Sequence, residues 1–206
     1  MTHVRPLPRL HAITDGFVLA LDDLGVRAAA IAAAGPAVAL HARDHAATAK
    51  ALAAVAARFV ALARPPEAAV FVNGRPDIAA AVGAQGVQLG SRDLAPADAR
   101  QVFPHGWVGR SVHSVEEARA AAAEGADYLV VGPIYQTPTH PGDAAGLALV
   151  KACAALGPPV IAIGGVTPNQ VPDLVAAGAY GAAAIRALWD ARDPAKAALG
   201  FLDHWT

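Results

Sequence analysis

The sequence has little charge of either sign and only one cysteine. Of its 206 residues 16% are charged, and 16 Lys and Arg nearly balance 17 Asp and Glu. Such a balance creates no positive field that would attract a polyanion, which disfavours nucleic acid as a partner. The lone Cys153 excludes an intrachain disulfide and a cysteine-based zinc site, and its alanine neighbours are typical of a helix interior.

Long hydrophobic runs are also missing. The longest one, residues 28–40, is interrupted by Gly35 and Pro36 and is shorter than the roughly 20 residues that span a bilayer. Arg5, Arg9 and two prolines interrupt the N-terminal segment where a secretory signal would have its apolar core. We therefore expect a cytoplasmic enzyme or binding protein with no membrane partner. The sequence leaves its oligomeric state open, a homo-oligomer included.

Short β-like runs alternate with alanine-rich helical segments along the whole chain, and no Pro/Gly/Ser-rich linker divides it. The expected strands are 10–14, 37–42, 69–72, 86–89, 107–111, 128–131, 159–163 and 180–185, and the expected helices are 19–33, 46–63, 76–82, 96–102, 114–123, 146–156, 167–177 and 194–204. Eight such units predict an α/β fold, a (β/α)₈ TIM barrel, as a single domain over residues 1–206. A doubly wound open sheet is the alternative.

Residues at the expected helix ends agree with this division. Ser114 and Glu117 have the spacing of a capping box, and Thr167 and Asp193 each precede a proline. Glycines follow five of the apolar stretches, as they do where helices end. These are Gly35, Gly83, Gly125, Gly157 and Gly178.

Polar side chains and glycines gather at the expected carboxyl ends of the strands, where barrel active sites lie. They are His41, Arg43 and His45; Asn73; Gln88 and Asp93; Ser111 and His113; Thr137, Thr139 and His140; Gly164 and Gly165; and Ile185 with Arg186. A Gly-Gly turn after the seventh strand, followed by the helix start at Thr167, predicts a phosphate site with backbone donors, to which Arg186 could add charge. A tight turn without a ligand is the alternative.

The histidines have several interpretations. His11 in the first strand is either a hydrogen-bonded residue of the barrel interior or a ligand contact. His41, His45 and His140 lack a recognised metal-ligand spacing, so proton transfer is favoured over a metal site. His140 lies in the long proline-rich loop 132–142, and loops of this length tend to be functional.

Several motifs resemble the thiamine phosphate synthase and thiazole tautomerase superfamily, nearly from end to end. They are His11-Ala-Ile-Thr-Asp15, Val72-Asn-Gly-Arg-Pro-Asp77, Gly86-Val-Gln-Leu89, Gly109-Arg-Ser-Val-His-Ser114, Gly125-Ala-Asp-Tyr128, Gly132-Pro-Ile-Tyr135 and Ala162-Ile-Gly-Gly165. The resemblance implies a (β/α)₈ barrel that binds a carboxythiazole phosphate, with the phosphate at the Gly-Gly turn and the end of the last strand.

The synthase branch joins hydroxymethylpyrimidine diphosphate to carboxythiazole phosphate, and its pattern implies cations and Mg²⁺ around the departing pyrophosphate. This chain departs from that pattern. His41 and His45 stand where the resemblance implies Gln and Lys, and His140 stands in place of a second Lys. Gly74 replaces one of two carboxylates, which leaves Asp93 as a weak or vestigial Mg²⁺ ligand.

The segments 13–15, 73–75 and 109–114 look closer to the tautomerase branch, which implies an isomerase that moves a proton on a thiazole phosphate without a cofactor. Pro133 stands where that branch has a histidine, so His140, or otherwise His113, is the expected catalytic group. One alternative is a divergent synthase that needs Mg²⁺ and uses His45 and His140 as cations. Others are a non-catalytic sensor or accessory protein and a barrel isomerase for another phosphorylated metabolite, because fold does not fix function.

Overall fold

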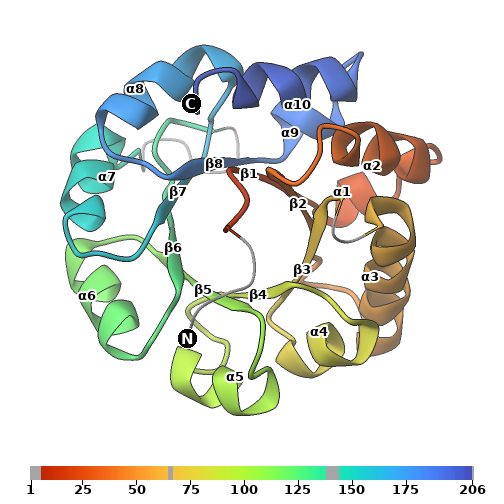
Figure 1. The fold of residues 1–206 in the computed structure, drawn as a ribbon, viewed down its shortest axis with the longest axis horizontal. Coiled ribbons are helices and arrows are strands. Elements are labelled where there is room, and N and C mark those ends of the chain that lie inside the picture. The colour runs from red at the N-terminus through yellow and green to blue at the C-terminus, as the bar shows by residue number, and fades with distance from the viewer. Residues whose placement is uncertain (1–5, 65–66, 138–143, 206) are drawn as a thin grey trace.

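Eight parallel strands close into a barrel in sequence order (Figure 1). The structure is a computed structural model that describes residues 6–64, 67–137 and 144–205. The strands are β1 (Leu10–Ile13), β2 (Val38–Ala42), β3 (Ala69–Asn73), β4 (Gly86–Leu89), β5 (Trp107–Val112), β6 (Tyr128–Val131), β7 (Val160–Ile163) and β8 (Gly181–Ala184). Because β8 pairs with β1, the predicted TIM barrel is confirmed and the open doubly wound sheet is wrong.

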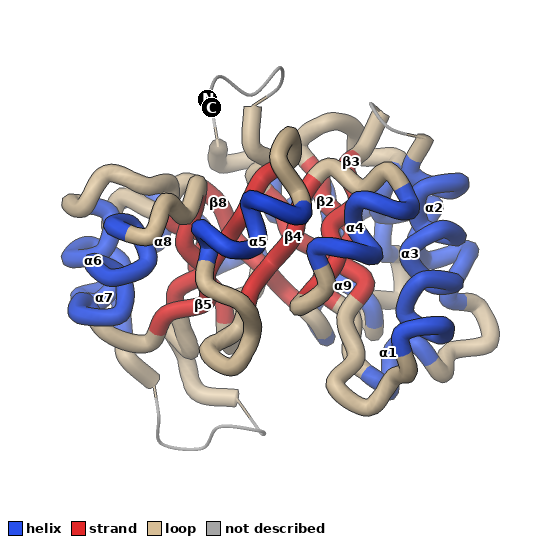
Figure 2. Tube along the Cα trace, turned by 90° about the horizontal axis from the view of Figure 1, so that it is seen from below, coloured by secondary structure: helices blue, strands red, loops and turns tan. Residues whose placement is uncertain are grey.

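Helices surround the barrel on its outer face (Figure 1). They are α1 (Gly16–Leu19), α2 (Leu24–Ala32), α3 (Ala49–Ala63), α4 (Pro76–Val82), α5 (Pro96–Val102), α6 (Val115–Ala123), α7 (Gly146–Ala154), α8 (Val171–Ala176), α9 (Arg186–Trp189) and α10 (Pro194–Leu202), with the 3₁₀ turn η1 (Pro168–Gln170) before α8. In Figure 2 the barrel is seen from the side, and α1, which follows β1, lies at its lower end.

Two helical segments differ from the prediction. The expected helix 19–33 is split, because Asp15 accepts a hydrogen bond from the Val18 N–H and starts α1 early, and a turn then leads to α2 at Asp23. The short helix α9 was not predicted. It carries Trp189 inward, where its fully buried ring stacks on Phe59 at a centroid distance of 6.1 Å.

The helix ends follow the sequence signals. The Ser114 and Asp193 side chains accept hydrogen bonds from the first turns of α6 and α10, as expected. All five glycines expected after helices have positive φ angles, from 70° at Gly83 to 109° at Gly157. The buried Cys153 packs from α7 into the core, which fits its expected place in a helix.

The core has two layers. A large one lies between the strands and the helices, and a smaller one fills the barrel interior around Phe71, Tyr128 and Ile161. A Cβ atom at Gly109 would lie 2.1 Å from the Tyr128 ring, so only glycine fits there. This inner layer closes the barrel below its mouth, and a ligand is therefore confined to the carboxyl ends of the strands.

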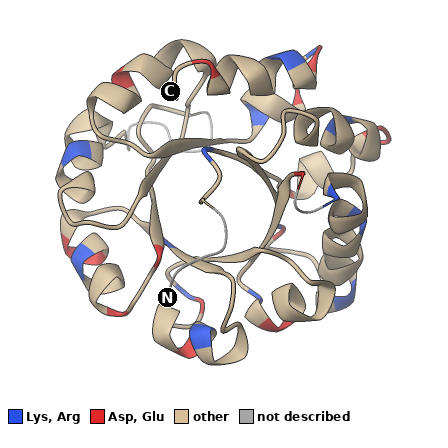
Figure 3. Cartoon of the chain, in the orientation of Figure 1, with Lys and Arg blue, Asp and Glu red and all other residues tan. Residues whose placement is uncertain are grey.

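Basic and acidic residues are interspersed around the helix ring (Figure 3), as the balanced composition predicts. Within the described part of the chain, no helix has the length and apolar character to cross a membrane.

Candidate active site

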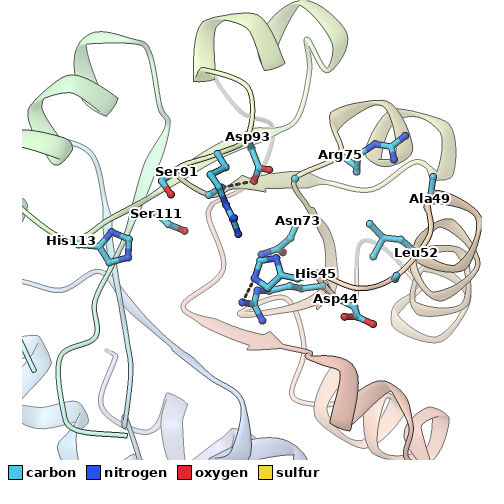
Figure 4. A pocket seen from close by; sticks show the side chains of 15 residues that line it. Asp44, His45, Ala49, Leu52, Asn73, Arg75, Ser91, Asp93, Ser111 and His113 are labelled. Atoms are coloured by element: carbon cyan, nitrogen blue, oxygen red, sulfur yellow. Dashed lines mark hydrogen bonds between the residues drawn. The ribbon is translucent and has the colours of Figure 1, made fainter. Parts of the chain in front are cut away.

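A cavity of about 450 Å³ opens at the carboxyl ends of β2 to β5 (Figure 4). Its polar lining comes from the last residues of those strands and from the residues that follow them. These are Arg43, Asp44, His45, Asn73, Arg75, Ser91, Arg92, Asp93, Ser111 and His113. The structure therefore brings together six of the predicted site residues, from four separate strand ends: Arg43, His45, Asn73, Asp93, Ser111 and His113.

Arg43 and His45 form a pair at the end of β2. The Arg43 guanidinium donates to His45 Nε2 at 2.6 Å (Figure 4), and the Arg43 N–H donates to the Thr14 hydroxyl at 2.9 Å. The nearby Arg43 charge, burial and Arg92 lower the pKa of His45, although Asp93 and Asp44 oppose them. His45 is therefore a neutral acceptor that orients Arg43. In this geometry His45 Nε2 accepts from Arg43, and the role of His45 as a cation in place of a lysine stays a prediction.

His41 lies beneath the cavity rather than in its wall. It is fully buried, and His41 Nδ1 lies 3.0 Å from Asn73 Oδ1, while His41 Nε2 lies 2.8 Å from His11 Nδ1. Burial lowers its pKa to about 4; the Arg43 charge also lowers it, and the Asn73 hydrogen bond raises it. His11 is fully buried too, so of its two interpretations the structure supports the hydrogen-bonded interior residue.

Gln88 plays a similar part under β5. Its side chain is 2% exposed and lies outside the cavity lining, and its amide donates to the Ser111 hydroxyl oxygen at 2.9 Å. The Ser111 hydroxyl hydrogen is thereby left to donate elsewhere, and Ser111 lines the cavity. His41 and Gln88, both predicted to contact substrate, thus support the residues that line the cavity, because their strand positions point into the barrel below its mouth.

Asp93 is the carboxylate that could hold a divalent cation. It accepts a hydrogen bond from the Gly90 N–H at 2.6 Å, and a Cβ atom at Gly74 would lie 3.1 Å from its Oδ1. No group of three or more metal-ligating side chains occurs among residues 6–64, 67–137 and 144–205. The other carboxylate of the lining, Asp44, accepts from the Ala46 N–H at 2.9 Å. The Asp93 carboxylate next to an open cavity fits a Mg²⁺ ion that arrives with substrate phosphates, which complete its oxygen shell, better than a permanent metal site.

Two further lining residues are held by carboxylates outside the cavity. The Arg75 guanidinium is paired with Asp77, with an Nε–Oδ1 distance of 2.8 Å. Glu117 accepts from the His113 backbone N–H at 2.7 Å, and its carboxylate lies 3.1 Å from His113 Nδ1. His113 is therefore turned toward α6, as a residue just past the strand end can be.

Sequence reasoning missed Arg92, which follows β4 in the segment 90–93 and lines the cavity. The signal is present, since the expected strand 86–89 ends directly before this segment. The sequence analysis selects Asp93 in that segment but not its neighbour.

The predicted phosphate site lies on the other side of the mouth, after β7 and β8. Gly164 and Gly165 have φ angles of 96° and 66°, and Cβ atoms there would lie 2.6 Å from Pro133 Cα and 2.8 Å from the Gln136 carbonyl oxygen. The glycines are thus required by packing against the segment 133–136, whether or not an anion binds. The phosphate site remains a prediction.

Arg186 and Ile185 sit at the start of α9, Ile185 as its N-cap residue. The Arg186 guanidinium is paired with Asp15 at 3.0 Å and lies 3.7 Å from Asp190. The helix expected to start at Thr167 begins instead as η1, where the Gln170 side chain accepts the Thr167 N–H. Thr137 belongs to the described chain, and Thr139 and His140 lie outside the described residues.

Comparison with known proteins identifies one family. A family model described as thiamine monophosphate synthase matches residues 10–188. The thiamine-phosphate synthase of Thermus thermophilus is 49% identical over 148 residues, which covers 70% of this chain and 71% of that protein. The enzyme of the same name from Mycobacterium bovis is 44% identical over 164 residues, covering 77% and 71% of the two chains.

A solved structure with the same architecture is the thiamine phosphate pyrophosphorylase from Pyrococcus furiosus. It superposes with a TM-score of 0.82 at 31% identity and covers 96% of this chain and 95% of its own. These relatives overturn the interpretation as a thiazole tautomerase and isomerase, since two of them are named thiamine-phosphate synthase and the third is named thiamine phosphate pyrophosphorylase. The substitutions at His45, Gly74 and His140 suggest a loss of pyrophosphate chemistry, but the cavity retains Arg43, Arg92 and Asp93.

Proposed function

The chain belongs to the thiamine monophosphate synthase family, and from this premise we propose that it is a thiamine-phosphate synthase that joins hydroxymethylpyrimidine diphosphate to carboxythiazole phosphate. The observation that carries the proposal is the cavity after β2 to β5, whose lining includes Arg43 from the end of β2 and Arg92 and Asp93 from the end of β4. A diphosphate with Mg²⁺ is the ligand whose charges this set would balance.

The reaction breaks the bond between the pyrimidine methylene carbon and the diphosphate and forms a bond from that carbon to the thiazole ring nitrogen, and the thiazole carboxyl group leaves as CO₂. Negative charge grows on the departing pyrophosphate. Arg43 and Arg92 would stabilise this charge, because a guanidinium remains protonated at neutral pH. The Ser111 hydroxyl, whose oxygen already accepts from Gln88, would add a hydrogen bond. His45 holds the Arg43 guanidinium toward the cavity without adding charge of its own.

Asp93 would hold Mg²⁺ together with the diphosphate oxygens. Such an ion, when bound, neutralises charge on the leaving group. The Gly90 N–H donates to this carboxylate and fixes its position beside the cavity.

The thiazole phosphate would bind across the mouth, with its phosphate near the Gly164–Gly165 turn and the end of β8. Both residues lack a Cβ atom because they are glycines, and they have positive φ angles; exposed backbone N–H groups at such a turn would suit an anion. The partners that we propose are thus small phosphorylated molecules.

The direct test incubates the protein with both substrates, with Mg²⁺ or with EDTA, and follows thiamine phosphate and pyrophosphate. We expect product only with Mg²⁺. The Asp93→Asn variant, which keeps an acceptor for the Gly90 N–H, should need a higher Mg²⁺ concentration for the same rate. Absence of product in the presence of both substrates and Mg²⁺ would show that the proposal is wrong.

Calorimetry supplies the matched binding experiment. Mg²⁺ alone should bind weakly, since Gly74 provides no second carboxylate, and it should bind more tightly when pyrophosphate is present. Equal Mg²⁺ affinity with and without pyrophosphate would contradict a site completed by the substrate.

A further inference from the structure

Three short polar contacts connect the floor of the barrel to the cavity. His11 Nε2 lies 3.1 Å from the Pro8 carbonyl oxygen, His11 Nδ1 lies 2.8 Å from His41 Nε2, and His41 Nδ1 lies 3.0 Å from the Asn73 amide. Both imidazoles are fully buried, and Asn73 lines the cavity. Each contact has a hydrogen-bond distance, so each needs one hydrogen between its two atoms.

The number of hydrogens limits how this line can be arranged. The Pro8 carbonyl oxygen can only accept, which requires a hydrogen on His11 Nε2. A neutral imidazole carries one N–H, so His11 Nδ1 then accepts, His41 Nε2 donates to it, and His41 Nδ1 is left as an acceptor. The group of Asn73 that faces His41 must therefore be its NH₂. Oxygen in that place would leave two lone pairs facing each other, or would need one extra proton on the pair.

The surroundings of the pair oppose an extra proton. The rings packed against it are Phe71, which contacts both imidazoles, and Tyr128, which contacts His11. The charged group that acts on His41 is Arg43, which is positive, and among the described residues no carboxylate is paired with either ring. Burial lowers the pKa of both histidines, and His41 lowers that of His11 further. The Asn73 hydrogen bond raises the pKa of His41 only while the amide oxygen faces the ring. Rotation of the Asn73 amide by half a turn only exchanges the positions of its oxygen and nitrogen, at a residue that lines the cavity.

We propose that the buried His11–His41 pair is a positioning device that holds the Asn73 amide with Nδ2 toward His41 and Oδ1 toward the cavity. The site then presents a fixed hydrogen-bond acceptor beside Arg43 and Asp93. It selects a substrate group that carries N–H or O–H, or a bound cation, and it disfavours a second anionic oxygen at this point. The inference rests on the proposed function only in taking the cavity as the substrate site.

Histidine tautomers report this arrangement directly. In protein labelled with ¹⁵N-histidine, long-range ¹H–¹⁵N correlation at pH 7.5 should show both buried rings as neutral Nε2–H tautomers. The His11→Phe and His41→Phe variants assign the two signals. An Nδ1–H tautomer at His41, or an imidazolium at either ring, would overturn the proposal. The measurement needs no activity, so it stands apart from the test of the synthase reaction.

Two additions make the test sharper. In Asn73→Asp an oxygen must face His41, so the His41 signal should change to Nδ1–H or imidazolium; an unchanged Nε2–H signal would show that the group at position 73 is not coupled to the His41 tautomer and would contradict us. Addition of Mg²⁺ with inorganic pyrophosphate to the unmodified protein should leave both tautomers unchanged, because the amide is already oriented. A change of the His41 tautomer on addition would show that the ligand, and not the buried pair, sets the amide. The exposed His105 serves as an internal reference for a ring outside the line.

Discussion

The rim of the barrel after β2 to β5 and the rim after β7 and β8 are built from different parts of the chain. The first presents side chains around a cavity, and two of them, Asn73 and Ser111, are held from below by buried His41 and Gln88. The second is a glycine turn whose backbone packs against the segment 133–136. Side chains at the first rim can change their chemistry while the backbone stays in place, whereas the turn after β7 has no room for a side chain at Gly164 or Gly165.

This difference explains where the sequence-based interpretation failed. His41, Gly74 and His45 replace the residues that the resemblance implies, and all three belong to the rim built from side chains. The substitutions looked like a change of reaction. The structure shows that His45 orients Arg43 and that His41 contacts Asn73. The first rim thus still has arginine side chains and the Asp93 carboxylate around its cavity.

The largest effect is expected when Arg43 is substituted. Arg43 and Arg75 both line the first rim, but Arg43 contacts His45 and Arg75 is paired with Asp77. Arg43→Gln should lower kcat/KM of the synthase reaction by roughly 10²–10³, because it removes charge stabilisation of the leaving group. Arg75→Gln is the matched control, since Arg75 lines the same cavity but is paired with Asp77. Steady-state kinetics measure kcat/KM for the two variants. An equal loss of kcat/KM in both would contradict the separate role that we assign to Arg43.

The buried support of the first rim should show in the pH dependence of stability. The pKa of His41 is about 4 in the folded chain and 6.5 ordinarily, so the unfolded chain binds the proton first as pH falls. The contribution of neutral His41 to the free energy of unfolding is thus fully present above pH 6.5. This contribution, on the order of 3 kcal/mol, is lost as the pH falls from about 6.5 to 4.

Denaturant unfolding from pH 7 to 4 measures this loss. The decrease of the unfolding free energy with falling pH should be shallower in His41→Leu. It should be unchanged in His105→Asn, which removes an exposed imidazole. A His41→Leu slope equal to that of the unmodified protein would show that the buried pair does not create the pH dependence.

The second rim should be sensitive to a single methyl group. Gly165 and Gly83 have nearly the same φ, 66° and 70°, but a Cβ at Gly165 would lie 2.8 Å from the Gln136 oxygen and one at Gly83 meets nothing within 4 Å. Gly83→Ala should cost about 1–2 kcal/mol from backbone strain alone. Gly165→Ala should cost roughly 1–3 kcal/mol more from overpacking, measured by thermal or chemical unfolding. Equal losses would mean that the 133–136 segment moves away freely.

The smallest effect is expected for Arg186→Gln. This guanidinium is half exposed and paired with Asp15, a type of contact that contributes about 0.2–1 kcal/mol. If backbone N–H groups bind the thiazole phosphate, its affinity in calorimetry should hardly change. A tenfold or greater loss would assign the phosphate to the Arg186 side chain, and equal affinity for the thiazole with and without its phosphate would place no phosphate site here at all.

The strands and most helices could be predicted because their signals are local. Alternating apolar residues, capping side chains such as Ser114 and the glycines after helices each act within a few residues of their position. The split of α1 from α2 was not predicted, because it depends on whether Asp15 caps a helix or stays in a loop. The candidate site was predicted as a set of strand ends, which the order of parallel strands in a barrel brings together.

By itself, the sequence determined the barrel, the rim on which polar residues gather and the absence of a second metal carboxylate at Gly74. Only the tertiary structure decided what those residues touch: that His41 and Gln88 lie below the cavity, that His45 accepts from Arg43, and that Arg186 is paired with Asp15. The physical reason is the separation in sequence between the groups that interact. Backbone periodicity and capping are set by neighbours in sequence, whereas hydrogen-bond partners and pKa values depend on groups from other strands, and these positions are fixed only when the barrel closes.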